Sequence, residues 1–267
     1  MSQRQLHSVG FAELQEELSG RDIAITGQIA DLRLMSGRQI TAVHFPVGEH
    51  DNAAAATRAC NRVLKRLVRD RLLVRLERRV GGIRKGSGSF VYALGPVGHR
   101  VLDLGGKRPR LGEPGPAFVQ HTLAVSQLVV DCTLAVRDKR FDLAVCQAEP
   151  RCWRHFTDVR GATTLRPDLF MAFGVGDYEY RFFIEVDRGT EHLPTVIRKC
   201  HLYQSYYVSG REQAVHGVSP RTCWIVPYQL RAERLRQAIA RDRHLKDMLF
   251  VVTTTEQALM TLSGGGS

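Results

Sequence analysis

The chain has 267 residues and a formal net charge of +11, with 43% hydrophobic and 24% charged residues, a composition typical of a soluble globular protein with room for two modest domains. It has no long uncharged apolar run, no signal peptide and no CxxC pair among its six cysteines. We therefore expect a cytoplasmic protein without a membrane span or a zinc cluster. Residues 1–110 carry 19 Lys and Arg against 10 Asp and Glu, a net +9, whereas residues 111–267 carry 19 against 17, a net +2, which favours a polyanion as partner of the N-terminal half.

The first fifty residues predict three short helices. The first covers residues 1–20, where apolar residues recur at helical spacing up to Gly20. The second begins at Asp22 and runs to Ser36-Gly37, and the third lies near residues 38–45. A loop with Pro46 follows.

The next predicted helix, residues 53–71, has two opposite faces. One is an apolar stripe that contains Cys60, Val63, Leu64 and Leu67. The other carries basic residues at steps of three or four: Arg58, Arg62, Lys65 and Arg69. Arg66 adds a fifth basic residue to this helix. Such a helix can pack on a core with one face and contact phosphates with the other; the plainer alternative is a solvated charged helix.

Two strand-like segments, residues 72–78 and 90–94, follow this helix and enclose a basic, glycine-rich hairpin tip. This order of elements resembles the winged helix-turn-helix group over about residues 8–104. The resemblance implies that the helix enters the major groove of double-stranded DNA and that the hairpin touches the backbone. The DNA-binding residues would be Arg58, Arg62, Lys65, Arg66, Arg69, Arg84 and Lys85. Winged-helix proteins often bind as dimers, so we expect a homodimer.

A second domain is predicted after a linker. Residues 105–117 are rich in glycine and proline and separate a domain of residues 1–104 from one of residues 118–258, followed by a flexible tail at 259–267. The mixture of helical and strand-like segments predicts an α/β (α+β) fold with a mixed sheet flanked by helices. The predicted elements are helix 118–137, strands 141–148, 163–173 and 178–186, helix 194–208, strand 222–226, helix 231–241 and strand 249–253.

Three carboxylates are expected at one end of the hairpin formed by strands 163–173 and 178–186. Side chains alternate along a strand, so Glu185 and Asp187 face the same side about 6.5–7 Å apart, and Asp168 can join them from the neighbouring strand. Carboxylates so placed suit a Mg²⁺ or Mn²⁺ ion. The alternative is that they are solvated, or paired with an arginine: Arg166, Arg181 or Arg188.

A family resemblance is carried by three segments. They are Arg166-Pro-Asp168, the run Glu185-Val-Asp-Arg-Gly-Thr-Glu191, and Lys199 with Tyr203 and Tyr206; His121-Thr-Leu-Ala-Val125 adds to them. Together they resemble the PD-(D/E)XK nuclease-like fold and, more narrowly, the replication-relaxation family of plasmids and integrative elements.

The nuclease-like resemblance implies metal-assisted phosphodiester hydrolysis. Asp168 and Glu185 would hold Mg²⁺, and a lysine would orient the attacking water. The lysine is expected two residues after Glu185, where this chain has Asp187. Lys199 could replace it from the following helix; the alternative is a solvated helix lysine.

The sequence therefore leads to a DNA-binding protein of a plasmid or integrative element that acts in replication, transfer or their regulation. Its second domain is expected to be structural or partner-binding, without a cofactor. Two alternatives remain: a metal-dependent DNA endonuclease that uses the acidic cluster with Mg²⁺ or Mn²⁺, and a DNA-bound adaptor that recruits replication or transfer proteins.

Overall fold

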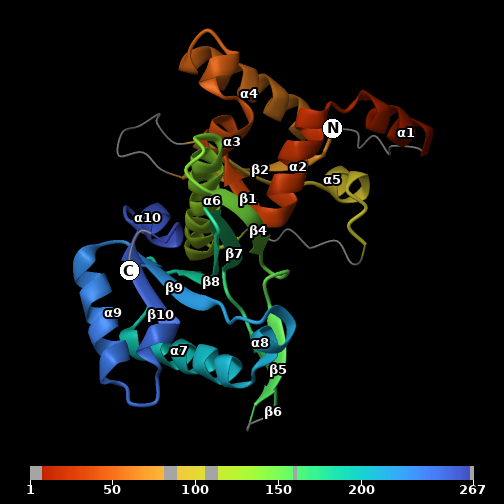
Figure 1. Cartoon of the computed structure of the whole chain (residues 1–267). Coiled ribbons are helices and arrows are strands. Elements are labelled where there is room, and N and C mark those ends of the chain that lie inside the picture. The colour runs from red at the N-terminus through yellow and green to blue at the C-terminus, as the bar shows by residue number, and fades with distance from the viewer. Residues whose placement is uncertain (1–7, 81–88, 106–113, 159–160, 265–267) are drawn as a thin grey trace. The chain divides into compact units, whose positions relative to one another are not determined.

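A computed structural model of the chain describes residues 8–80, 89–105, 114–158 and 161–264 (Figure 1). The predicted α/β class is confirmed. The chain divides into two compact units, residues 1–126 and 127–267. The division falls inside helix α6 (Pro116–Arg137) rather than at residues 105–117, because the first half of α6 packs on the first unit through Val119 and Leu123.

The first unit contains a three-stranded antiparallel sheet in the order β1-β3-β2, surrounded by helices. Helix α4 corresponds to the predicted helix 53–71 and ends slightly earlier, at Arg69. Strand β1, the turn η1 and helix α5 were not predicted. The elements are α1 (Ser8–Glu17), α2 (Gly20–Leu32), β1 (Leu34–Ser36), α3 (Gly37–His44), the 3-10 turn η1 (Val47–Glu49), α4 (Ala53–Arg69), β2 (Leu73–Val80), β3 (Ser89–Leu94) and α5 (Pro96–Val101).

Local capping fixes where three of these helices begin. Ser19 and Ser36 each form a capping box, with Asp22 at the start of α2 and with Gln39 at the start of α3. Asn52 accepts a hydrogen bond from the Ala55 amide at the start of α4. The apolar stripe of α4 is then buried, with Cys60, Leu64 and Leu67 among its core residues, so the opposite, basic face is left to solvent.

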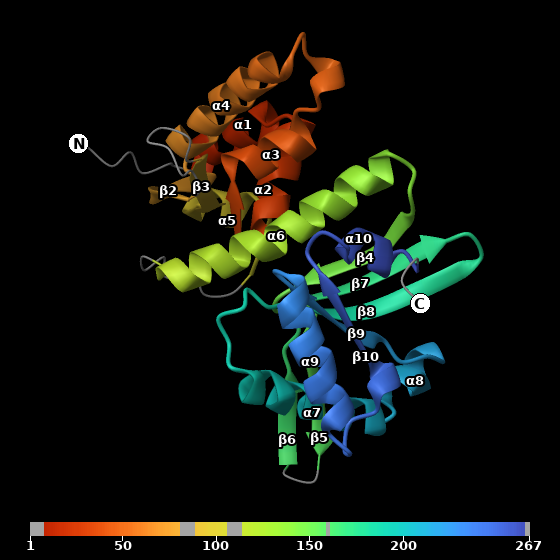
Figure 2. The same cartoon turned by 90° about the vertical axis from the view of Figure 1, so that its left-hand side faces the viewer.

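The second unit is built on a five-stranded mixed sheet in the order β10-β9-β8-β7-β4 (Figure 2). Strands β4, β7 and β8 are antiparallel neighbours, whereas β8, β9 and β10 run parallel. The elements after α6 are β4 (Asp142–Ala148), β5 (Arg154–Asp158), β6 (Gly161–Leu165), β7 (Leu169–Val175), β8 (Tyr178–Val186), α7 (Leu193–Val208), α8 (Arg211–His216), β9 (Arg221–Val226), α9 (Gln229–Arg241), the 3-10 turn η2 (Asp247–Leu249), β10 (Phe250–Thr254) and α10 (Ala258–Leu262).

The predicted strand 163–173 is two strands in the structure. β6 pairs with β5 in a separate two-stranded sheet, and β7 begins only after Asp168. The break coincides with Pro167, which has no amide hydrogen for a ladder bond. The tail expected from residue 259 is also helical at first, because α10 continues to Leu262, which is fully buried.

Helices α7 and α9 cover the face of the sheet that carries Phe183. The aromatic side chains of Phe183, Tyr203 and Trp224 are buried there together with Leu235 of α9. Glu185 lies two residues after Phe183 in β8 and therefore points to the same face. The sheet thus carries a carboxylate into an otherwise apolar core.

Candidate nucleic-acid interface and buried acidic cluster

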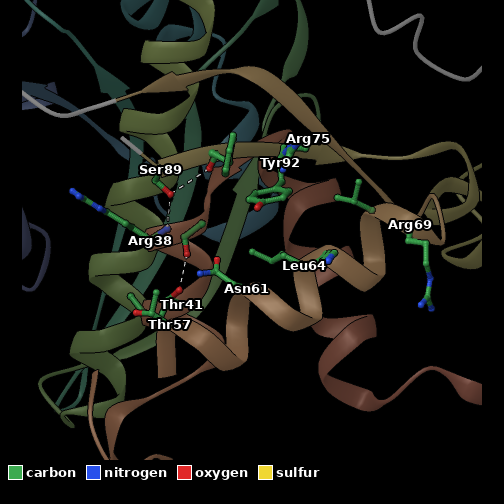
Figure 3. Close-up of a pocket in the computed structure, with 14 residues that line it drawn as sticks. Arg38, Thr41, Thr57, Asn61, Leu64, Arg69, Arg75, Ser89 and Tyr92 are labelled. Atoms are coloured by element: carbon green, nitrogen blue, oxygen red, sulfur yellow. Dashed lines mark hydrogen bonds between the residues drawn. The ribbon is translucent and has the colours of Figure 1, made fainter. Parts of the chain in front are cut away.

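Helix α4 carries a row of four polar residues at steps of four: Thr57, Asn61, Lys65 and Arg69. Residues four apart lie one above the other on a helix, so these side chains share one face. All four line a groove of about 1030 Å³ that is bounded by α3, α4 and the strands β2 and β3. Figure 3 shows Asn61 in the middle of this groove, with Arg38 and Arg69 directed toward opposite ends.

The groove is basic. Its cationic lining residues come from three elements: Arg38 of α3, Lys65 and Arg69 of α4, and Arg75 of β2. Within the described part of the chain, no Asp or Glu lines it. A concave surface with one sign of charge concentrates the opposite charge from solution.

Contacts across the groove hold its two walls together. The Arg38 amide donates a hydrogen bond of 3.2 Å to Ser89 Oγ, which ties the start of α3 to β3. The Arg75 guanidinium lies 4.4 Å from the centre of the Phe90 ring, a cation–π contact between adjacent strands. These contacts between α3, β2 and β3 therefore hold the groove in place within the folded unit.

The DNA-binding residues expected from the sequence fall into four groups, of which Arg66 forms the last. Arg58, Arg62 and Lys65 are exposed on α4. Arg69 is exposed and lines the groove, although it also pairs with the neighbouring Asp70 at 2.8 Å. Arg84 and Lys85 lie outside the described residues.

Arg66 faces the other way. Its Nη2 donates to Oδ1 of Asp22 at 2.7 Å, and the Asp22 side chain is 1% exposed. Burial by itself raises the pKa of Asp22, but hydrogen bonds from Arg66 and Ser19 outweigh it and hold the pKa below its ordinary value. Arg66 is thus engaged in joining α4 to α2, which the sequence pattern did not indicate.

Among the groove residues that sequence reasoning missed are Thr57, Asn61, Arg38 and Arg75. Asn61 lies between Thr57 and Lys65 in the row of steps of four, so the helical period could have found it. Arg38 and Arg75 stand on other elements. No local pattern places them beside α4, because their proximity depends on tertiary packing.

In the second unit, the structure brings Asp168, Glu185 and Lys199 together with Tyr203. Lys199 Nζ donates to Glu185 Oε2 at 2.5 Å, and the Tyr203 hydroxyl donates to Glu185 Oε1. Asp168 Oδ2 accepts a hydrogen bond of 2.8 Å from the Val186 amide. Lys199 is therefore not a solvated helix lysine.

Asp187 does not join this group. Its Oδ2 accepts a hydrogen bond of 2.8 Å from Arg231 Nε, and its Oδ1 accepts one of 2.7 Å from the Gly189 amide. Two of the three arginines that the sequence suggested as partners of the acidic cluster contact other residues. The Arg166 guanidinium lies 4.7 Å from the Trp153 ring centre, and Arg181 pairs with Glu179 at 2.5 Å.

The ionisation of Glu185 and Lys199 reflects their burial and their contact. Burial raises the pKa of Glu185 to about 8, although Lys199 and Tyr203 favour the carboxylate. Burial lowers the pKa of Lys199, but Glu185 and Asp168 outweigh this effect, and the net pKa lies above its ordinary value. The ammonium group thus supplies positive charge at the carboxylates.

Protein donors compete with a divalent metal for this donor set. Magnesium prefers six oxygen ligands in octahedral geometry and usually binds through ionised carboxylates. Here both Glu185 oxygens accept protein hydrogen bonds, and both Asp187 oxygens are engaged. Among the described residues there is no group of three His, Cys, Asp or Glu that could hold a metal ion.

One described helix, α6, is long and apolar enough to cross a membrane, judged by its length and composition. More than half of the apolar part of α6 is buried inside the protein. Core helices have the same character, so α6 gives no clear sign of a membrane protein.

Comparison with known protein families gives a match that covers most of the chain. The family described as replication-relaxation matches residues 27–222, which is more than half of the chain and extends into both units. No curated protein and no solved structure matches the chain.

Proposed function

Because the chain belongs to the replication-relaxation family, we propose that it binds double-stranded DNA of a plasmid or integrative element through the groove of its first unit. Family membership points to a role in replication or in a mobile element. The more specific proposal is that α4 enters the major groove and that the surrounding cations contact phosphates.

The basic groove is the observation that carries this proposal. It combines cations from α3, α4 and β2, and no acidic residue lines it in the described chain. Arg58 and Arg62 extend the positive surface along α4. A net charge of +9 over residues 1–110 has the same sign, so electrostatic attraction over the whole unit favours a polyanion.

For the second unit we propose a structural or partner-binding role, with replication or transfer proteins as the candidate partners. Lys199 of α7 pairs with Glu185 of β8. Arg231 of α9 pairs with Asp187, the residue that follows β8. The acidic cluster then connects two helices to the sheet. Hydrolysis by this cluster is not part of the proposal, because protein donors already engage its carboxylates.

A salt titration with a random-sequence DNA duplex tests the proposal. Wild-type affinity should fall steeply with salt concentration as phosphate counterions are released on binding. The double variant Arg62→Ala, Lys65→Ala should bind more weakly, with a log–log slope reduced by about one unit per lost phosphate contact. Arg234→Ala, Arg243→Ala is the matched control, because it removes the same charge from exposed positions of the second unit.

The control should keep the wild-type slope. Equal slopes for wild type and the Arg62, Lys65 variant would place the DNA contacts elsewhere. A wild-type protein that does not bind the duplex at low salt would refute the proposed function.

A further inference from the structure

The polar row on α4 changes in chemistry along the helix. Its first two residues, Thr57 and Asn61, are neutral hydrogen-bonding groups, whereas its last two, Lys65 and Arg69, are cations. All four line the same groove. The two halves are therefore suited to different parts of a DNA duplex: neutral donors and acceptors suit base edges, and cations suit phosphates.

Asn61 is the most versatile group in the neutral half. It is exposed in the groove, and its carboxamide has no hydrogen-bond partner among the described residues. The side chain offers both a donor and an acceptor. Thr57, by contrast, already donates its hydroxyl hydrogen to the Ala53 carbonyl at 2.9 Å.

We infer that Asn61 is a specificity-determining residue that reads adenine in the major groove. This inference rests on the proposed function. An asparagine carboxamide can accept a hydrogen bond from adenine N6 and donate one to N7, a pattern that the other bases do not present. A recognition helix contacts base edges from the side that faces into the major groove, and Asn61 is the central residue of α4 on its groove-lining side.

Selection from a randomised duplex library, followed by sequencing, tests this inference. The wild type should enrich a motif that contains adenine at a defined position. Asn61→Ala should lose the preference at that position, and the affinity ratio of the selected to the random duplex should fall roughly 10-fold. Its salt slope should stay at the wild-type value, because a neutral side chain releases no counterion.

Lys65→Ala is the comparison variant, since it changes the next residue of the same row. It should keep the selected motif but lower the affinity for all duplexes and reduce the salt slope by about one. Asn61→Asp, which has acceptors but no donor, should also lose the adenine preference. Thermal unfolding of each variant shows that the protein remains folded.

The outcomes separate this inference from the proposed function. If the wild type binds DNA but enriches no motif, or if Asn61→Ala keeps the wild-type motif, Asn61 does not read bases although DNA binding stands. If the wild type binds no duplex in the library, the proposed function and this inference both fail.

Discussion

Arg66 of α4 and Asp22 of α2 form an ion pair with 2.7 Å between Nη2 and Oδ1. The carboxylate also accepts hydrogen bonds from the Ser19 amide and hydroxyl at its other oxygen. A buried charge is tolerated only when such partners are present. The helix that we propose to contact DNA therefore uses one of its arginines to anchor itself to the unit.

We expect Arg66→Ala to destabilise the protein by about 2 kcal/mol, because it leaves the buried Asp22 carboxylate without its cation. Urea unfolding measures the loss. Arg62→Ala, on the exposed side of the same helix, should change the free energy of unfolding by less than about 0.5 kcal/mol. Similar effects of the two substitutions would contradict the structural role of Arg66.

The lowered pKa of Asp22 predicts a loss of stability in acid. The folded protein holds this carboxyl ionised below the ordinary value of 3.8. Its contribution is therefore present above that pH and is lost as the pH falls through the lower, folded-state pKa. Asp22→Asn should melt at a lower temperature than wild type at pH 7 and lose less stability between about pH 5 and 2.5. Parallel melting curves over this range would exclude Asp22 as a contributor.

The burial of Glu185 predicts an effect in the opposite pH direction, which the contact with Lys199 moderates. The raised pKa of Glu185, about 8 against an ordinary 4.5, means that stability falls as the pH rises between these values. Lys199→Met should raise the pKa of Glu185 further, so the variant should lose more stability than wild type between about pH 6 and 9. Arg198→Met, an exposed neighbour on α7, is the control and should follow the wild type. Thermal unfolding at several pH values measures the difference.

The occupied carboxylates predict no specific effect of divalent metal. Mn²⁺ should raise the melting temperature of wild type no more than that of Asp168→Asn, because a ligand stabilises a protein only if it binds the native state. Asp168→Asn should also be less stable than wild type, since it weakens the bond to the Val186 amide. A Mn²⁺-dependent rise that Asp168→Asn abolishes would restore the endonuclease hypothesis, and cleavage of supercoiled DNA would then be the next measurement.

The sequence by itself determined most of the longer helices and strands, and the faces of α4 and β8. The helical period separated the core stripe of α4 from Arg58, Arg62 and Lys65, and the strand period placed Phe183 and Glu185 on one side of β8. The replication-relaxation resemblance was also carried by local motifs, and the family match confirms it. These features depend on residues that are close in the sequence, so they can be predicted from the sequence alone.

Only the tertiary structure decided which groups meet. Arg66 pairs with Asp22, and Asp187 pairs with Arg231; in both pairs the two residues are 44 positions apart in the sequence. Arg38 and Arg75 join the α4 row in one groove, and Lys199 comes to Glu185 instead of a lysine at position 187. A local period fixes the face to which a side chain points, but the partner on that face depends on how distant elements pack.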